Sequence, residues 1–392
     1  MSSSGALRIV HVFRAPLGGL FRHVIDLSVE QAARGHAVGL FFDCGGDCAR
    51  VREAVARIPE ALRLGVAMAP IARNPRPSDI AALRAFGRFL NQTRPDVVHG
   101  HGSKGGLYAR LSGERRIRAY TPHGGSFNYP PGVRRGLYMA VERALAPRTD
   151  LFLFESDHIR AICEAHVGAR CGLHRVVVNG LSEREFTVAT PAEDATDILY
   201  VGELRAAKGI DTLLDALALV AHETGAAPSA TLVGSGPDRE ARIAHAARRG
   251  LQAQVRFPGP MPAARAFSLG RVMVAPSRAE SMPYIVLETV AAQVPLLTTF
   301  VGGVPEIFGP YADRLGPPGD PEDLARRILI ELRRPADERA ARARELAAYV
   351  RERFSLENMA ETVLSAYREA LARRGAQSLR SAKAAAPLVN EA

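Results

Sequence analysis

The stretch Val272–Glu288, VMVAPSRAESMPYIVLE, contains the pattern on which the fold assignment depends. Its apolar start, Val272–Ala275, predicts a buried strand, and the polar residues that follow predict a loop presenting Glu280. A capped helix is predicted to begin near Ser281–Pro283, with Glu288 farther along it. Two glutamates eight residues apart are common by chance. In a strand–loop–helix unit, however, they are suited to bidentate hydrogen bonds with the hydroxyls of a sugar or a ribose.

Short apolar runs alternate with helical patterns on both sides of this stretch. The runs are unbroken, which is typical of parallel strands covered on both faces. Helices are predicted between them, for example at Phe21–Arg34, Ile80–Asn91 and Ile210–Glu223. The pattern predicts an α/β protein with two doubly wound, Rossmann-like domains and a ligand cleft at the strand carboxyl ends. The other predicted strands are Leu7–Phe13, Ala37–Phe42, Asp96–His99, Arg118–Thr121, Leu151–Phe154, Arg175–Val178, Ile198–Val201, Ala230–Val233, Gln254–Phe257 and Leu296–Thr299.

A polar, proline-containing segment, Thr187–Asp197, predicts a linker between the two domains. The first domain is therefore expected at residues 1–190 and the second at residues 191–355. From Pro321 to Arg374 the pattern is wholly helical and amphipathic. Residues 375–392 are rich in Ala and Ser, and we expect them to form a disordered tail.

The composition of the 392 residues excludes several classes of protein. No apolar run approaches the ~20 residues that span a bilayer. The first residues, MSSSGALRIVHVF, lack the basic start of a signal peptide, so a cytoplasmic location is expected. The cysteines fit neither a zinc finger nor a disulfide framework, and we expect reduced thiols; a metal site at the first two is the alternative. They are Cys44, Cys48, Cys163 and Cys171.

The net charge of +10 lies wholly in the first half of the chain. Residues 1–190 contain 26 Lys and Arg against 16 Asp and Glu, whereas the remainder contains 25 of each. A basic half favours an anionic partner such as phosphate, acidic lipid or nucleic acid; the alternative is a solvated surface with scattered arginines. Because no zinc-finger, RNA-recognition or helix-turn-helix pattern is present, a nucleic-acid partner is not expected.

Glycine-rich turns follow the first predicted strand of the first half and the second predicted strand of the second half. Gly18-Gly19 precedes the helix predicted from Phe21, where backbone N–H groups and the helix dipole can bind an anion. A tight turn is the alternative, and the dinucleotide pattern G-x-G-x-x-G is absent. In the second half, Gly234-Ser235-Gly236-Pro237 is expected to offer free backbone amides.

Histidines follow two predicted strands of the first half. His123, in Thr121-Pro122-His123-Gly124-Gly125, has an imidazole that can donate to a phosphate or a sugar hydroxyl; a loop histidine in a turn is the alternative. The segment His99-Gly100-His101-Gly102 is interpreted as a loop lining the cleft rather than as a metal site. Lys104 is expected either to meet an acceptor phosphate or to be solvated.

The chain contains only three lysines, and one of them is Lys208 in the segment Arg205-Ala206-Ala207-Lys208-Gly209. Arg205 and Lys208 lie three residues apart at a predicted loop-to-helix junction. We expect both cations to converge on one diphosphate.

Taken in order, these motifs resemble the retaining GT-B glycosyltransferases of family 4, from about Arg8 to about Arg374. PSRAESMPYIVLETVAAQVPLLTTFVGGVPEIF (276–308) is typical of that family and is closest to members that build bacterial surface polysaccharides. The resemblance implies the GT-B fold, with a helix at 356–374 that returns to the first domain. The family's aromatic-Ser-aromatic segment survives as Phe354-Ser355-Leu356.

The resemblance also implies a nucleotide-diphosphate-sugar donor, UDP-sugar favoured, bound mainly by the second domain and transferred without a metal. Arg205 and Lys208 match the diphosphate ligands, and Glu288 matches the ribose ligand. Glu280 matches the residue at the donor sugar, and His123 the histidine near the reacting centre. Donor contacts are further implied for Gly18, Gly19, Ser281 and Met282. Closure of the cleft would exclude water.

One departure from the family pattern concerns the donor sugar. The family commonly has Glu-x-Phe-Gly where this chain has Glu280-Ser281-Met282-Pro283, and Pro283 has no backbone N–H to donate. A sugar-nucleotide 2-epimerase, which shares the GT-B fold, is the main alternative function. A non-enzymatic anion- or nucleic-acid-binding protein and an inactive scaffold are the others.

The acceptor is expected to be a glycan or an anionic, lipid-linked sugar at the inner membrane surface, with the protein bound peripherally. Arg134, Arg135 and Arg143 are interleaved with Leu137, Tyr138, Met139 and Val141 in a predicted amphipathic helix. The alternative is that this helix packs its apolar face on the core.

Overall fold

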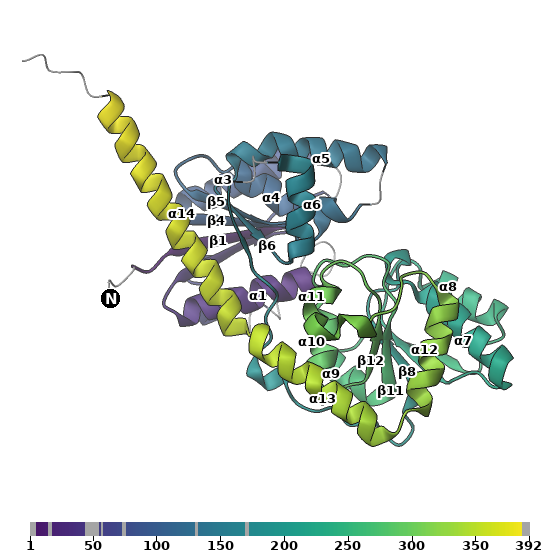
Figure 1. Cartoon of the computed structure of the whole chain (residues 1–392). Coiled ribbons are helices and arrows are strands. Elements are labelled where there is room, and N and C mark those ends of the chain that lie inside the picture. The colour runs from purple at the N-terminus through teal and green to yellow at the C-terminus, as the bar shows by residue number, and fades with distance from the viewer. Residues whose placement is uncertain are drawn as a thin grey trace, which may run out of the picture. The chain divides into compact units, whose positions relative to one another are not determined.

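The computed structural model describes residues 5–14, 18–43, 55, 58–72, 76–129, 132–168 and 172–385. The chain forms two compact units (Figure 1). Unit 1 comprises residues 1–155, 159–178 and 356–392, and unit 2 comprises residues 156–158 and 179–355. Cys44, Cys48 and Cys171 lie outside the described residues, whereas Cys163 is buried in unit 1.

Unit 1 is built on a parallel sheet of seven strands in the order β3-β2-β1-β4-β5-β6-β7. Six of them correspond to predicted strands. The exception is β3, a short edge strand that is only partly buried, so its residues form no continuous buried run. The strands are β1 (Arg8–Phe13), β2 (Ala37–Phe42), β3 (Gly65–Met68), β4 (Val97–His101), β5 (Ile117–Thr121), β6 (Leu151–Phe154) and β7 (Leu173–Val176).

Helices cover both faces of this sheet. Phe86 and Tyr108 pack against Val10 and Val98 on one face. Leu27 packs against Ile9 on the other, together with residues from the end of the chain. The helices are α1 (Gly18–Ala33), α3 (Ser78–Thr93), α4 (Gly102–Arg110), α5 (Val133–Leu145), α6 (Asp157–Val167) and α14 (Leu356–Ala385), with 3-10 turns η1 (Pro59–Ala61), η2 (Gly125–Asn128) and η3 (Ala146–Arg148).

The last helix, α14, belongs to the core of unit 1 (Figure 1, yellow). Its residues Met359, Val363 and Tyr367 are buried against Ile9 and Leu151 of the sheet. The return of this helix to the first domain therefore agrees with the prediction. Its predicted end at Arg374 is wrong, because the helix continues to Ala385. The four alanines of residues 375–385, with Gln377, Leu379 and Arg380, favour helix there, and the first proline is Pro387.

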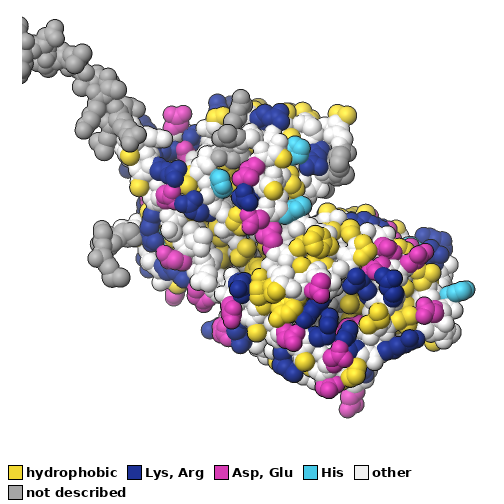
Figure 2. All heavy atoms as spheres, viewed as in Figure 1, with side chains coloured by type: hydrophobic (Ala, Val, Ile, Leu, Met, Phe, Trp, Pro, Cys, Tyr) yellow, Lys and Arg dark blue, Asp and Glu magenta, His cyan; other side chains and the backbone are white. Residues whose placement is uncertain are grey.

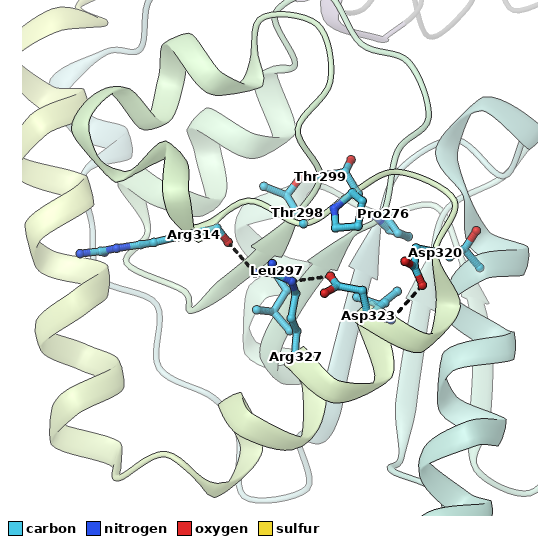
Figure 3. Close-up of a pocket in the computed structure, with 12 residues that line it drawn as sticks. Pro276, Leu297, Thr298, Thr299, Arg314, Asp320, Asp323 and Arg327 are labelled. Atoms are coloured by element: carbon cyan, nitrogen blue, oxygen red, sulfur yellow. Dashed lines mark hydrogen bonds and ion pairs between the residues drawn. The ribbon is translucent and has the colours of Figure 1, made fainter.

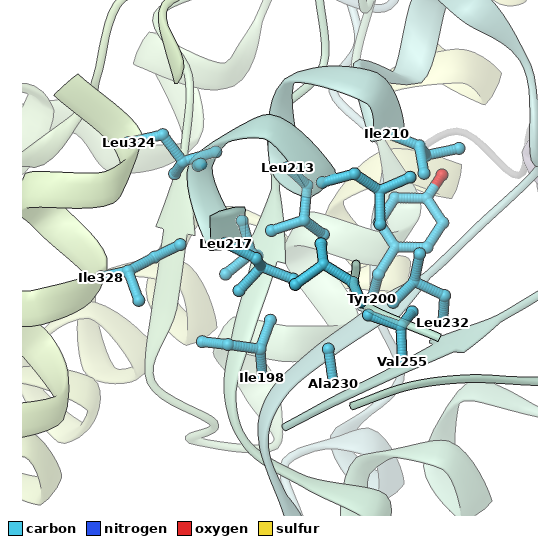
Figure 4. Packing of buried hydrophobic residues seen from close by; sticks show 14 of the residues in the cluster. Ile198, Tyr200, Ile210, Leu213, Leu217, Ala230, Leu232, Val255, Leu324 and Ile328 are labelled. Carbon is cyan, nitrogen blue, oxygen red and sulfur yellow. The ribbon is translucent and has the colours of Figure 1, made fainter. Parts of the chain in front are cut away.

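Unit 2 contains a parallel sheet of five strands in the order β10-β9-β8-β11-β12. Leu213 and Leu217 of α7 pack with Leu324 and Ile328 of α12 over Ile198 of the central strand (Figure 4). The elements are β8 (Thr196–Val201), η6 (Ala206–Lys208), α7 (Ile210–Thr224), β9 (Ala230–Val233), α8 (Arg239–Arg248), β10 (Val255–Gly259), α9 (Ala263–Ala266), η7 (Phe267–Leu269), β11 (Gly270–Ala275), α10 (Tyr284–Ala291), β12 (Leu296–Thr298), α11 (Val304–Phe308), η8 (Gly309–Arg314), α12 (Pro321–Arg333) and α13 (Ala336–Arg353), with β7 followed by η5 (Glu183–Glu185).

The boundary between the units lies earlier in the sequence than predicted. The Asn179 side chain donates to the Met282 carbonyl at 2.7 Å, and the Leu181 N–H donates to the Phe354 carbonyl at 2.8 Å. Residues 179–190 are therefore held by unit 2. The predicted linker Thr187–Asp197 also packs there, since the Ala189 N–H donates to the Ala292 carbonyl and β8 already begins at Thr196.

Both sheets reverse their strand order at one point. In unit 1 the chain proceeds from β1 outward through β2 and β3, and then returns to place β4 on the other side of β1. Unit 2 does the same with β8 and β11. In open parallel sheets, ligands bind at the carboxyl ends of the two strands that flank this switch point. Each unit therefore has one such position to examine.

Candidate functional site

The switch point of unit 2 holds a charged pair. Lys208 ends η6, after β8, and Glu280 lies in the loop after β11. The Lys208 Nζ donates to Glu280 Oε1 at 2.6 Å, and the Ser277 hydroxyl donates to the same oxygen at 2.6 Å. The side chains of Lys208 and Glu280 are only 16% and 10% exposed. Two residues singled out separately in the sequence thus meet at the predicted end of the sheet.

Arg205, the other predicted diphosphate ligand, has a different partner. Its Nε forms an ion pair with Glu203 Oε2 at 2.8 Å, and about half of each side chain is exposed. Arg205 and Lys208 therefore hold separate carboxylates in this structure. The expected convergence of the two cations on one group is not seen here.

Glycines allow the loops of this site to approach one another closely. Gly209 has a φ of +66°, and a Cβ there would lie 1.9 Å from the Pro276 carbonyl oxygen. Gly302 has a φ of +56°, and its Cβ would lie 1.9 Å from the carbonyl oxygen of Glu280. A side chain at either position would displace the segment that carries Lys208 or Glu280.

The amide of Gly234 is not free as predicted, because it donates to the Gly259 carbonyl at 3.0 Å. The β10–β9 register shifts between Arg256 and Gly259, which brings that carbonyl to the end of β9. The glycines of this loop serve a packing role instead. A Cβ on Gly234 or Gly236 would lie 1.9 Å from the Gly202 oxygen or 2.4 Å from the Leu204 oxygen.

Arg278 is a residue of this site that the sequence analysis did not select. Its guanidinium donates to both carboxylate oxygens of Asp211 at 2.8 Å and to the Ala206 carbonyl at 2.9 Å. It therefore ties the loop after β11 to the turn that carries Lys208. Burial alone would raise the pKa of Asp211, but the hydrogen bonds and charge of Arg278, with the charge of Arg242, lower it.

The segment from Ser281 to Glu288 differs from its prediction in two respects. The helix α10 begins at Tyr284, with Pro283 at the N-cap and no capping side chain. Met282 is buried at 3% exposure, so its side chain belongs to the packing of unit 2. Ser281 accepts a hydrogen bond from the Gly303 N–H through its carbonyl, at 2.7 Å. Glu288 lies half-buried on α10, one helix turn beyond Tyr284.

A small pocket lies beside this site, at the ends of β11 and β12 (Figure 3). Pro276, Thr298 and Thr299 line one side of it, and the Asp323–Arg327 ion pair lines the other. Its cavity volume of about 10 Å³ is that of a single water probe. A nucleotide does not fit in it, so this pocket is not the candidate ligand site.

The switch point of unit 1 holds neutral rings in place of charges. His11 Nδ1 lies 2.9 Å from His101 Nε2, and His101 Nδ1 lies 3.0 Å from His123 Nε2. His99 and His101 are buried residues of β4, so the prediction that they form a loop is wrong. The glycines between and after them suggested a loop, but Gly100 instead lets α4 approach the strand: a Cβ there would lie 2.3 Å from the Gly105 oxygen.

Burial keeps these imidazoles neutral. It lowers the pKa of His11 to about 4, although the hydrogen bond to Gln31 raises it in part. Burial also lowers the pKa of His99, His101 and His123 well below the usual value, and neighbouring imidazoles lower it further. Two trios, His11–His99–His101 and His23–His101–His123, have ligand nitrogens within 4.8 Å of one another, close enough to be considered for a metal.

The loop after β5 places His123 in a strained conformation. His123 has a φ of +50°, uncommon for a residue with a side chain, and Gly124 and Gly125 also have positive φ. Glu155 accepts the Gly124 N–H, and the Ser103 hydroxyl accepts the Ser126 N–H at 3.0 Å. Strain of this kind is concentrated at functional sites, so the loop supports a functional role for His123.

Two other predicted residues of unit 1 differ from expectation. Gly18 and Gly19 are the first residues of α1, so the helix begins before Phe21. Lys104 is not solvated, because its Nζ donates to Asp79 at 2.8 Å and both side chains are mostly buried. Burial alone would raise the pKa of Asp79, but the hydrogen bonds from Lys104 and the Arg76 N–H, with the charge of Lys104, together lower it.

The sequence matches two family models, one in each half. The model described as Glycosyltransferase Family 4 matches residues 17–184, and the model described as Glycosyl transferases group 1 matches residues 195–333. Glycosyltransferase EpsD of Bacillus subtilis (strain 168) is 31% identical over 264 residues, or 61% of this chain and 68% of that protein. The chain belongs to the family 4 glycosyltransferases.

Three further proteins resemble this family 4 chain at lower sequence identity. Teichuronic acid biosynthesis glycosyltransferase TuaC of Bacillus subtilis (strain 168) is 27% identical over 246 residues, so the match spans 60% of each protein. Sucrose-phosphate synthase from Thermosynechococcus elongatus has a TM-score of 0.75 at 21% identity, over 93% of this chain and 100% of that one. Anabaena Alr3699/HepE in complex with UDP-glucose has a TM-score of 0.75 at 17% identity, over 92% and 98%. These structures share the fold, and the GT-B prediction is confirmed.

In this glycosyltransferase chain, α5 exposes part of its apolar residues. Val133, Leu137 and Val141 are 93%, 67% and 44% exposed. Met139 and Glu142 are the buried side chains of this helix, and Glu142 forms a buried ion pair with Arg110 at 2.6 Å. The alternative that this helix packs its apolar face on the core therefore holds for Met139 and Tyr138, which pack in a hydrophobic cluster of unit 1, but not for Leu137 and Val141.

The charge asymmetry increases when it is counted by unit. Unit 1 contains 30 Lys and Arg against 17 Asp and Glu, a net charge of +13. Unit 2 contains 21 against 24, a net charge of −3. Basic and acidic side chains are interspersed on the face shown in Figure 2. Among the described residues, none of the helices is both long enough and apolar enough to cross a bilayer.

Proposed function

We propose that this family 4 glycosyltransferase transfers a sugar from a nucleotide-diphosphate sugar, UDP-sugar favoured, to a glycan or lipid-linked acceptor in the synthesis of a bacterial surface polysaccharide. In this proposal the anomeric configuration is retained and no metal is used. The observation that carries it is the Lys208–Glu280 pair at the β8/β11 switch point.

The donor diphosphate takes the place of Glu280 as the partner of Lys208. While no diphosphate is bound, the Glu280 carboxylate at 2.6 Å balances the positive charge of Lys208 and holds its ammonium group in position. When the diphosphate binds, Lys208 neutralises it, and the half-exposed Arg205 can turn from Glu203 to add a second charge. Both cations then stabilise the negative charge that develops on the departing nucleotide.

Release from Lys208 gives Glu280 a second role. Its carboxylate then accepts hydrogen bonds from hydroxyls of the donor sugar, while Glu288 on α10 accepts them from the ribose. No side chain caps the first turn of α10, so its backbone N–H groups are not taken by a cap and can face the donor. HepE, which shares the fold, has been solved with UDP-glucose, and this favours a uridine nucleotide here.

The acceptor belongs to the basic unit 1. Its net charge of +13 attracts an anion such as the diphosphate of a lipid-linked sugar. The exposed residues Val133, Leu137 and Val141 share α5 with Arg134 and Arg143, an arrangement suited to the surface of an anionic membrane. We therefore assign α5 as a peripheral membrane contact.

A thermal-shift screen against UDP-, GDP- and ADP-sugars, with chelator present, tests donor binding. The correct donor is expected to raise the melting temperature, since it binds only the folded state. Lys208→Ala and Glu288→Ala should lose most of that shift. Lys104→Ala, which removes the only other ion-paired lysine found in the described residues, should retain it. Full donor binding and turnover in both site variants would contradict the assignment.

Turnover of the donor alone separates transfer from the epimerase alternative. A transferase leaves the sugar unchanged until an acceptor is added, and then gives a product with the donor's anomeric configuration. Conversion of the UDP-sugar to its epimer without acceptor would support the alternative instead. An absolute requirement for a divalent cation would contradict the metal-independent mechanism.

Co-sedimentation with lipid vesicles tests the membrane assignment. Binding to anionic vesicles is expected to exceed binding to neutral ones and to fall several-fold in Leu137→Ser, because that change removes buried apolar area in the bound state. Ile330→Ser alters another exposed apolar residue, in unit 2 (53% exposed), and should bind as the wild type does. Equal binding to both vesicle types would exclude this role for α5.

A further inference from the structure

Four side chains of unit 1, three buried and the last partly exposed, form a continuous series of hydrogen-bonding groups, which we name the histidine chain: Gln31, His11, His101 and His123. Gln31 Oε1 lies 2.9 Å from His11 Nε2, and His11 Nδ1 lies 2.9 Å from His101 Nε2. His101 Nδ1 lies 3.0 Å from His123 Nε2. The chain begins on α1, crosses the β1/β4 switch point, and ends on the strained loop after β5.

The proton positions along this chain follow from its first member. A neutral imidazole has one N–H and one lone pair, so each ring must donate on one side and accept on the other. The Gln31 carbonyl oxygen can only accept, which places the hydrogen of His11 on Nε2. His11 Nδ1 then accepts from His101 Nε2–H, and His101 Nδ1 accepts from His123 Nε2–H.

The last ring is left with its lone pair on Nδ1. Among the described residues, no hydrogen-bond partner of His123 Nδ1 is found, and the side chain is partly exposed. His23 packs edge-on against the His123 ring at 4.8 Å, which limits rotation of the imidazole.

We infer that the histidine chain fixes His123 in the Nε2–H tautomer, so that its Nδ1 accepts a hydrogen bond from a substrate hydroxyl, and that His101 is the positioning residue which sets this state. The identity of that hydroxyl, on the donor sugar or the acceptor, rests on the proposed glycosyl transfer. The tautomer itself does not. The sequence suggested the opposite polarity, with His123 as a donor to phosphate or sugar.

Burial supports this inference independently of the distances. Because burial lowers the pKa of His11, His101 and His123, no ring of the chain carries a second proton at neutral pH. A protonated ring would donate on both sides and break the order. The chain therefore keeps one direction of donation from His123 to Gln31.

A matched residue on the same strand provides the control. His99 is as buried as His101, and the two ring centroids are 3.9 Å apart. Its partners lie outside the chain, however: His99 Nδ1 contacts the Tyr367 hydroxyl at 2.7 Å and Nε2 contacts Thr121 Oγ1 at 2.8 Å. Replacing His99 should therefore cost stability without changing His123.

The test is a long-range 1H–15N correlation spectrum of the ligand-free full chain, labelled with 15N-histidine, at neutral pH. His123 is assigned from its loss in His123→Gln. The wild type and His99→Phe should show His123 protonated on Nε2, whereas His101→Phe should show a mixture of tautomers. His101→Gln keeps one donor and one acceptor and should restore the order.

Kinetics give the functional readout. In His101→Phe, kcat should fall about 10–100-fold, as is typical when a group that orients a site residue is removed, with the donor KM unchanged. His101→Gln should recover most of this loss, and His99→Phe should show little of it. If His101→Phe does not fold, as judged by circular dichroism, His11→Phe removes the next link and is read in the same way.

Several outcomes would overturn the inference. They are wild-type His123 protonated on Nδ1, an unchanged His123 tautomer in His101→Phe, or tight binding of one equivalent of Zn²⁺ that shifts the histidine nitrogens. Because the spectra need no substrate, they are independent of the proposed function. If the tautomers respond as expected and no donor gives turnover, glycosyl transfer is wrong and the histidine chain stands.

Discussion

The two units contain different chemistry at the same position of the same strand order. At the β1/β4 junction of unit 1 the side chains in contact are His11 and His101, both neutral. At the β8/β11 junction of unit 2 they are Lys208 and Glu280, an ion pair. A neutral pair can hold protons in a fixed order, whereas a charged pair can exchange one partner for an incoming anion. In the proposed function, unit 1 orients a substrate group and unit 2 neutralises charge.

Removing the carboxylate from the charged junction should have the largest effect. In Glu280→Gln the side-chain size is kept but the charge opposite Lys208 is lost, and we expect turnover to fall by about 10²–10³-fold. Steady-state kinetics with the donor found by thermal shift measure this. Glu240→Gln, in an exposed pair with Arg239, should be unaffected. Wild-type turnover in Glu280→Gln would show that the two junctions do not differ as proposed.

Acid should destabilise the neutral junction. The pKa of His11 is 6.5 in the unfolded chain and about 4 in the folded one, so the unfolded state binds more protons between these values. The contribution of His11 to the free energy of unfolding is therefore fully present above pH 6.5. Between pH 6.5 and about 4 the free energy of unfolding falls with decreasing pH, by about 1.4 kcal/mol per pH unit for each such histidine. Urea unfolding across this range measures the slope.

The control for the acid experiment is a histidine outside the cluster. His11→Asn should reduce the slope, whereas His222→Asn, an exposed residue of α7, should leave it unchanged. An identical slope in His11→Asn and the wild type would mean that the buried rings do not account for the acid response.

The smallest effect is expected at the support of the charged junction. Arg278→Lys cannot form the bidentate contact with Asp211, so the turn carrying Lys208 is held less firmly. Because Arg278 is 38% exposed, the loss of unfolding free energy should be about 1 kcal/mol or less, with a several-fold weaker donor affinity. Arg239→Lys, in an exposed pair, should change neither. Unaltered donor affinity in Arg278→Lys would remove this residue from the site.

The sequence predicted the sheets well because their strands are buried on both faces. A strand such as β6 (Leu151–Phe154) is an unbroken apolar run, and helices on both sides of the sheet require that pattern. The partly buried edge strand β3 lacked this signal and was missed. The domain boundary was placed too late because the polar segment after Thr187 reads as a linker, although its backbone is hydrogen-bonded to unit 2.

The candidate site was predictable where the residue types and their places after strands stand out in the sequence, whatever their separation along the chain. Lys208 and Glu280 each follow a strand, so their meeting follows from the order of the parallel strands. The Arg278–Asp211 contact joins positions 67 residues apart, and neither residue stands out in the sequence. The orientation of α5 depends on a buried ion pair between Glu142 and Arg110, and amphipathicity alone cannot show which face is buried.

The return of α14 to unit 1 has a consequence for biosynthesis. Ile9 and Tyr367 belong to the same hydrophobic cluster, yet nearly the whole chain lies between them. At a translation rate of about 5–20 residues per second, on the order of 20–70 s pass between their synthesis. Unit 2 is thus fully synthesised before unit 1 can complete its core. The sheet of unit 1 leaves the ribosome before the helix that covers part of one face, α14, has been made.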